Sequence, residues 1–329
     1  MRPSERVGLV RVASGLLGAA LILTASLAMS PARADAQEPH LEVLSERFQG
    51  QLEALRDTVD GVLGVAILDL ESGNVYGVNR TLVFPQASAI KISILVELYR
   101  QVEAGILQLE ERLPVEAATA VGGAGVLPFF GDGTSHLALR DLAVLMIVLS
   151  DNTATNLLIE QVGMEQVSRT MADLGFPAIR LQRRMIQTRA SARGIENIAT
   201  PADAAGLMER IHRCALPMQA SLCEDMRRIL EIPRSGTLPS GVPSGIPLAW
   251  KSGSLEGVAV AWGIVNLPGR PYVVAAMVNY GEGDAAGDAL RQISSLSHAY
   301  FARLARSTPH GARVPLPILM EVRGGVSTP

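Results

Sequence analysis

The chain has 329 residues, 48% of them hydrophobic, so one large domain or two small ones could bury roughly three quarters of the unfolded surface. The formal net charge is -3, and aromatic residues make up only 4%. Without a surplus of basic residues or aromatic side chains on which bases could stack, nucleic acid is excluded as a partner.

The first 36 residues have the order of a secretory signal peptide. Arg2, Arg6 and Arg11 precede an uncharged run over residues 12–29, and two small-x-small sites follow before residue 37. We predict cleavage after Ala36 and export to the periplasm or out of the cell. An uncleaved membrane anchor remains the alternative, because this run of apolar and small residues approaches the length that spans a bilayer.

Apolar spacing predicts a helix followed by a hairpin. Over residues 41–59 the apolar residues fall on one helical face. The next stretch, GVLGVAILDLESGNVYGVN, has strand-like apolar runs on both sides of the turn residues 71–74. This order predicts a helix laid on an antiparallel sheet.

The middle of the chain is helical in character. Runs rich in Leu, Ile, Val and Ala cover residues 90–107, 137–149 and 153–162. Thr200 and Pro201 have the sequence of an N-cap and a first helical residue, so another helix is expected to begin there.

Strand-like segments return at Leu248, and a final helix is expected over residues 285–303. These elements predict an α+β fold with three α/β/α layers. One antiparallel sheet would be flanked by the N- and C-terminal helices, with a mainly helical lobe at about 88–247 beside it. The domain would cover residues 37–305, followed by a poorly ordered tail over 306–329.

Two cysteines, Cys214 and Cys223, are present in a chain that we expect to be exported, where a disulfide would persist. One continuous helix would separate them by about 13 Å along its axis. Pro217 breaks such a helix, so a loop-closing disulfide and two buried thiols both remain open. The histidines have no ligand spacing, so neither a metal site nor another cofactor is indicated.

Lysine is almost absent from the chain. There are 27 arginines but only two lysines, Lys91 and Lys251. Arginine keeps its proton in proteins, whereas a buried lysine changes its pKa readily and can act as a base. The two lysines are therefore candidates for chemistry.

Ser88 precedes Lys91 by three residues at the start of a predicted helix, so their side chains would share a face. A hydroxyl beside a neutral amine is an activated nucleophile, and free N–H groups at the helix start suit an oxyanion. A serine N-cap with a lysine that extends to solvent is the alternative.

Two further motifs follow in the chain. Ser150, Asp151 and Asn152 end an apolar run, where they could also be a helix stop and an N-cap. Lys251 begins Lys-Ser-Gly on a late strand, where the alternative is an exposed lysine on a sheet edge.

The three motifs, in this order, resemble S-x-x-K, S-D-N and K-T-G of class A β-lactamases and penicillin-binding proteins. The resemblance covers residues 41–303. It implies Ser88 as the nucleophile and Lys91 as the amine that takes its proton. It also implies that Ser150 relays a proton to the leaving nitrogen, and that Lys251 sets the nearby charge.

The resemblance also assigns binding roles. Asn152 would hydrogen-bond the amide of the substrate side chain. Ser252 stands where threonine is more common and would bind the substrate carboxylate. Gly253 would allow a close approach of strand and substrate, and the backbone N–H groups of Ser254 and Ser88 would form the oxyanion hole.

The loop before Thr200 departs from the family pattern. Class A enzymes carry a glutamate there that activates water for deacylation, but residues 184–187, the expected place, contain no carboxylate. Glu196 is the only acid in this loop, and it remains a possible deacylation base. Its alternative role is a loop carboxylate close to a helix N-terminus.

The family's arginine for the substrate carboxylate also lacks an obvious match, and Arg234 and Arg270 are possible substitutes. The resemblance implies a monomeric class A-like β-lactamase without a cofactor or a stable membrane partner. Its substrate would be a β-lactam or a peptidoglycan D-Ala-D-Ala stem peptide. A D-alanyl-D-alanine carboxypeptidase and a sensor that binds β-lactams or cell-wall fragments without turnover are the alternatives.

Overall fold

The computed structural model describes residues 39–282, 284–308 and 310–323. The predicted signal peptide lies outside these residues. From Pro39 onward the chain forms one compact unit. None of the helices in the described ranges has the length and apolar content needed to cross a membrane.

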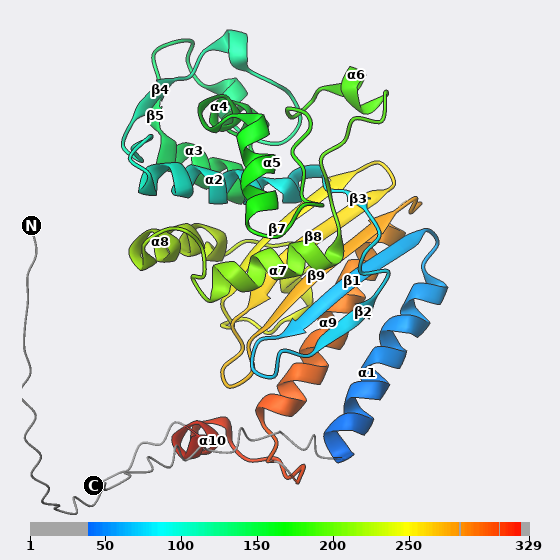
Figure 1. Cartoon of the computed structure of the whole chain (residues 1–329). Coiled ribbons are helices and arrows are strands. Elements are labelled where there is room, and N and C mark those ends of the chain that lie inside the picture. Colours follow the sequence, from blue (N-terminus) through cyan, green and yellow to red (C-terminus); the bar gives the residue numbers. More distant parts are fainter. Residues whose placement is uncertain (1–38, 283, 309, 324–329) are drawn as a thin grey trace, which may run out of the picture. The chain divides into compact units, whose positions relative to one another are not determined.

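A five-stranded antiparallel sheet, in the order β2-β1-β9-β8-β7, organises the molecule (Figure 1). Its strands are β1 (Val62–Asp69), β2 (Val75–Val78), β7 (Leu248–Leu255), β8 (Val258–Val265) and β9 (Tyr272–Asn279). The prediction that strands from both ends of the chain share one sheet is confirmed, because β1 pairs with β9 along its whole length.

Both faces of this sheet are buried, which explains its nearly continuous apolar strands. Val65 and Ile67 belong to one apolar cluster and their neighbours Ala66 and Leu68 to the other, as alternation along a strand requires. The helices α1 (Pro39–Thr58) and α9 (Ala285–Ala305) cover the first face, and α7 (Pro201–His212) covers the second (Figure 1). The three-layer α+β prediction is therefore confirmed.

Local signals explain where these helices dock and begin. The Phe48 ring of α1 stacks on Tyr300 of α9 with centroids 4.3 Å apart. The Thr200 hydroxyl accepts a hydrogen bond from the Asp203 backbone N at 3.1 Å, so the predicted N-cap of α7 is confirmed.

The helical lobe contains α2 to α6 and α8. Their bounds are α2 Lys91–Glu103, α3 Leu139–Val148, α4 Asn152–Val162, α5 Met164–Asp173, α6 Thr188–Ser191 and α8 Ala220–Glu231. Two small strand pairs join its loops, namely β3 (Phe84–Pro85) with β6 (Ile198–Ala199) and β4 (Arg112–Pro114) with β5 (His136–Ala138). The lobe stands beside one end of the sheet (Figure 1).

Two regions complete the unit. Cys214 and Cys223 form a disulfide with Cα atoms 5.7 Å apart, which decides between the two alternatives left by the sequence.

The tail differs from our expectation, because Leu316–Arg323 form a helix, α10. Leu316 and Met320, four residues apart on one helical face, lie against Gly269 of the β8–β9 turn and give this helix a docking surface.

Candidate active site

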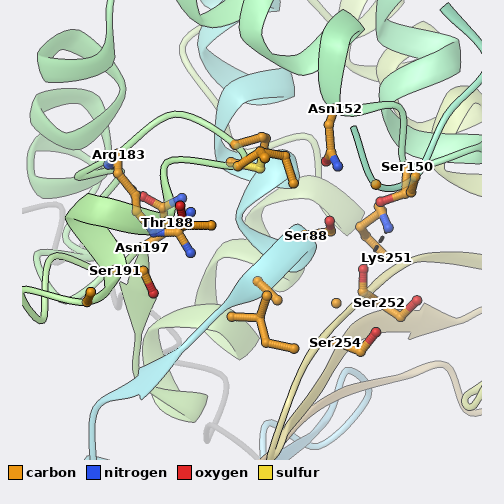
Figure 2. Close-up of a pocket in the computed structure, with 18 residues that line it drawn as sticks. Ser88, Ser150, Asn152, Arg183, Thr188, Ser191, Asn197, Lys251, Ser252 and Ser254 are labelled. Carbon is orange, nitrogen blue, oxygen red and sulfur yellow. Dashed lines mark hydrogen bonds between the residues drawn. The ribbon is translucent and has the colours of Figure 1, made fainter. Parts of the chain in front are cut away.

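All three sequence motifs meet at one cavity of about 740 Å³ between the sheet and the helical lobe. Figure 2 shows Ser88 between the loop residues on one side and the lysine and serine side chains on the other. The predicted site residues that line this cavity are Ser88, Ser150, Asn152, Lys251, Ser252, Gly253 and Ser254. Lys91 lies buried behind the cavity wall, and Glu196 does not line it.

Ser88 lies in a short 3-10 helix, Ala87–Ile90, that leads directly into α2. Ala87 before it has φ of 43°, an uncommon conformation for a residue with a side chain and one that is often found at functional sites. Gly253 of β7 packs against this turn, since a Cβ at Gly253 would lie 2.5 Å from the Ser88 backbone N. The close approach at Gly253 is therefore between β7 and the Ser88 backbone, whereas the resemblance implied one between the strand and the substrate.

Lys91 is fully buried and makes three polar contacts. Its Nζ lies 2.8 Å from Ser150 O, 3.1 Å from Ser150 Oγ and 2.9 Å from Asn152 Oδ1. Among the described residues no hydrogen bond joins Nζ to Ser88 Oγ. The alternative of a lysine that extends to solvent is therefore wrong.

The surroundings of Lys91 favour its neutral form. Burial, with the charge of Lys251 in addition, holds the pKa of Lys91 well below its ordinary value, and Asp151 opposes this shift. A neutral amine has two N–H donors and one lone pair. Ser150 O and Asn152 Oδ1 can only accept, which leaves the lone pair free for a hydroxyl proton.

The Ser150 corner is held by Asp151, a residue whose importance the sequence did not reveal. Its buried carboxylate caps α4 through Ala154 N at 2.8 Å, so the N-cap interpretation of this motif also holds. The same carboxylate accepts hydrogen bonds from Val126 N at 2.6 Å and Leu127 N at 2.9 Å. Ser150 itself has φ of 54°. Asp151 thereby fixes the strained corner against the loop beside the cavity.

Lys251 is only 4% exposed, so the alternative of an exposed edge lysine is wrong. Its Nζ donates to Ser252 O at 2.6 Å. Burial, reinforced by the guanidinium of Arg234, lowers the pKa of Lys251 to about 7.

Neither arginine proposed for the substrate carboxylate lines the cavity. Arg234 lies over the Trp250 ring at 4.5 Å and donates to backbone oxygens, including Ile232 O at 2.8 Å. Arg270 pairs with the buried Asp69 at 2.6 Å, at the end of the sheet away from Ser254.

Glu196 closes the loop that precedes α7. Its carboxylate lies 2.7 Å from Arg183 Nη2 and also accepts a hydrogen bond from the Ser191 hydroxyl. With both oxygens engaged and no place on the cavity wall, Glu196 is not positioned to activate water at Ser88. The proposal of Glu196 as deacylation base is therefore corrected to a structural ion pair.

Met185 occupies the cavity wall where the sequence led us to look for a carboxylate. Asn156 holds its backbone, accepting from Met185 N at 2.8 Å and donating to Met185 O at 3.3 Å. No acidic side chain lines the cavity among the described residues. Sequence reasoning missed Asn156 and Met185, because the two are 29 positions apart and neither has a local signal.

The motifs lie within a stretch of the chain that matches a known protein family. The family model described as the β-lactamase enzyme family matches residues 47–301, which include all three motifs. The chain belongs to this family. Beta-lactamase L2 of Stenotrophomonas maltophilia is 27% identical over 239 residues, or 69% of this chain and 77% of that protein.

Solved structures of similar proteins share the fold. A β-lactamase from Sphaerobacter thermophilus DSM 20745 is 32% identical with a TM-score of 0.72, over 77% of this chain and 97% of that one. A mutant of PBP-A, solved as an acyl-enzyme complex with penicillin G, is 27% identical with a TM-score of 0.71. Its match covers 80% of this chain and 97% of the mutant. Penicillin-binding proteins and β-lactamases are thus both among the structural relatives of this family member.

The low pKa of Lys251 predicts a pH-dependent affinity for substrate carboxylates. Lys251 is charged below about pH 7 and neutral above it. In a Ser88→Ala variant, which cannot be acylated, the dissociation constant for benzylpenicillin should rise above pH 7 by up to about tenfold per unit. Calorimetric titration from pH 6 to 8.5 measures this, because the ligand carboxylate stays ionised throughout. An affinity that is constant over this range would contradict the prediction.

The corrected role of Glu196 is tested by Glu196→Gln. Loss of one charge of a partly buried ion pair should lower the free energy of unfolding by about 1–3 kcal/mol. Denaturant unfolding measures this loss. The rate at which an acylated Ser88 is released should change by less than about tenfold, since general bases contribute 100-fold or more. A large loss of release with unchanged stability would restore Glu196 as the base.

Proposed function

We propose that this chain is a serine hydrolase of the β-lactamase type, acting on the amide of a β-lactam ring. Ser88 Oγ attacks the lactam carbonyl carbon and gives its proton to the neutral amine of Lys91. The ring C–N bond breaks and the nitrogen takes a proton from Ser150 Oγ, which recovers one from Lys91. Water then hydrolyses the Ser88 ester and restores the free serine.

The single observation that carries the proposal is the environment of Lys91. A fully buried lysine with a depressed pKa contacts the Ser150 hydroxyl at 3.1 Å, beside a cavity that contains Ser88. If Lys91 had only a structural role, an apolar residue could fill the same volume without the cost of desolvating an amine. The placement therefore favours proton transfer.

The remaining cavity residues have binding roles in this proposal. Backbone N–H groups of Ser88 and Ser254 would stabilise the developing oxyanion. Lys251 and the hydroxyl of Ser252 would hold the ring carboxylate. Asn152 would contact the acyl side-chain amide through Nδ2, which already donates to Gly122 O at 3.1 Å and has a second N–H.

One observation favours a second candidate, a D-alanyl-D-alanine peptidase of peptidoglycan. The described residues place no carboxylate on the cavity wall, so the step that releases the acyl group has no strong general base. Such an enzyme would be acylated by a β-lactam and remain acylated for longer than a proficient β-lactamase. A sensor would be acylated in the same way but would never release the acyl group.

One experiment separates these functions. Purified protein is mixed with a labelled penicillin and the label on Ser88 is followed over time, alongside turnover of a chromogenic cephalosporin and release of D-alanine from a stem peptide. Turnover of the cephalosporin supports the β-lactamase, D-alanine release supports the peptidase, and a stable label alone supports the sensor. Folded wild-type protein that never labels would refute the acyl-enzyme.

We also propose that the protein is exported. The support is the order of charged, apolar and small residues before residue 37. N-terminal sequencing of the protein recovered from cells should begin at Gln37, whereas an intact Met1 start would support the membrane anchor. A resistance function follows only if expression raises the tolerance of a sensitive host to β-lactams.

A further inference from the structure

The side of the cavity opposite the lysine and the serines of β7 has no role in the reaction described above. Arg183, Thr188, Ser191 and Asn197 form this side, across Ser88 from Ser252 and Ser254 (Figure 2). Ser191 and Arg183 are engaged with Glu196, which leaves Thr188 and Asn197 to face a ligand.

Asn197 is the most informative of these residues, because it is 2% exposed yet lines the cavity. Its Oδ1 accepts from Gln182 N at 2.8 Å and from Arg183 N at 3.0 Å. Two backbone donors fix which end of the amide is the oxygen. Its Nδ2 has no hydrogen-bond partner among the described residues, so two N–H donors remain for a ligand.

The groups around Asn197 favour a ligand that accepts hydrogen bonds. Arg183 lines the cavity, and its guanidinium is paired with Glu196, so the two charges beside Asn197 balance. The Thr188 hydroxyl adds a further donor on the same wall, and the described lining residues include no acid. A carboxylate only accepts hydrogen bonds, so it fits a wall that offers N–H and O–H donors and no acid.

We propose that this wall is a subsite for a carboxylate on the acyl side of the substrate. The inference rests on the proposed function, in which Ser252 and Lys251 hold the ring side and Ser88 attacks between the two. The acyl side chain must then extend toward Asn197. The preferred substrates are β-lactams or peptides whose acyl side chain carries a free carboxylate.

The test uses two penicillins that differ in one group, benzylpenicillin and its α-carboxy derivative. The second-order rate constant for acylation of Ser88 is measured for each, and their ratio is compared between variants. Asn197→Asp keeps the oxygen that accepts from Gln182 and Arg183 but replaces the two donors with a second carboxylate oxygen. It should lower the ratio of α-carboxy to benzyl rates by about 10- to 100-fold.

Gln187→Glu is the matched control. Gln187 lies on the same loop, is exposed and does not line the cavity, and its Oε1 accepts from Arg184 N at 3.1 Å. The variant therefore adds the same charge and keeps the same acceptor, and it should leave the ratio within about twofold of wild type, because solvent screens an exposed charge. Thr188→Val, at an exposed position that tolerates change, should lower the ratio by a smaller factor than Asn197→Asp.

The outcomes are distinct. A ratio unchanged in Asn197→Asp, or lowered equally in Gln187→Glu, overturns the subsite. If Asn197→Asp fails to fold, as seen by thermal unfolding, the Thr188→Val ratio decides, and an unchanged value overturns the proposal. If neither penicillin acylates folded wild type, the proposed function itself is wrong and the subsite falls with it.

Discussion

Replacing Lys91 by arginine is expected to abolish acylation of Ser88, with a loss of at least about 1,000-fold in the rate of labelling by penicillin. Arginine keeps the positive charge but cannot give up its proton, and its planar head is larger than the fully buried site allows. Time-resolved labelling with a fluorescent penicillin measures the rate. Labelling close to the wild-type rate would refute Lys91 as the base.

Lys91→Met is the control for folding. Methionine has a similar length, fills the buried site without a charge and removes the cost of burying an amine. This variant should still unfold cooperatively on heating, although Ser150 O and Asn152 Oδ1 lose their donor, and it should still fail to label. Failure of the arginine variant alone could reflect overpacking, whereas failure of both with a stable methionine variant identifies the amine.

Placing a carboxylate at Met185 is expected to shorten the life of the acyl-enzyme by about 100-fold or more, the usual contribution of a general base. Met185 lies on the cavity wall and Asn156 holds its backbone on both sides. Burial would also raise the pKa of the new carboxyl group and make it a better base near neutral pH. The release of labelled penicillin from Met185→Glu measures the effect.

Met185→Gln is the matched control, because it has the size of glutamate without a base. It should leave the release rate within about threefold of wild type. An equal acceleration in both variants would show that loop disturbance, and not proton transfer, speeds release. An unchanged rate in Met185→Glu would mean that the side chain does not reach the ester.

Much of the fold and of the candidate site could be predicted because their signals are local. Apolar runs beside turn residues revealed the strands, helical spacing revealed the helices, and the Thr200 cap marked the start of α7. The rarity of lysine was enough to identify Lys91 and Lys251 as candidates for chemistry. Both are buried, as a chemical role requires.

The predictions that were wrong concern contacts between distant positions. Glu196 was considered as a base because it is the only acid in its loop, but its contact with Arg183 depends on how that loop folds back. The pairing of Arg270 with Asp69 likewise depends on the register of β1 and β9. The spacing of residues along the chain gives no information on either of these two contacts. The free N–H donors of Asn197 could not be predicted for the same reason.

The pairing of β1 with β9 has a consequence for how the protein folds during its synthesis. β1 lies inside the sheet, and its partner β9 is synthesised only after the whole helical lobe. Until β9 has been made, one edge of β1 is unpaired. The sheet that positions Lys251 near Ser88 is then incomplete. Pairing of such distant segments is slow. A nascent chain therefore keeps its sheet open and its site incomplete until β9 has been made.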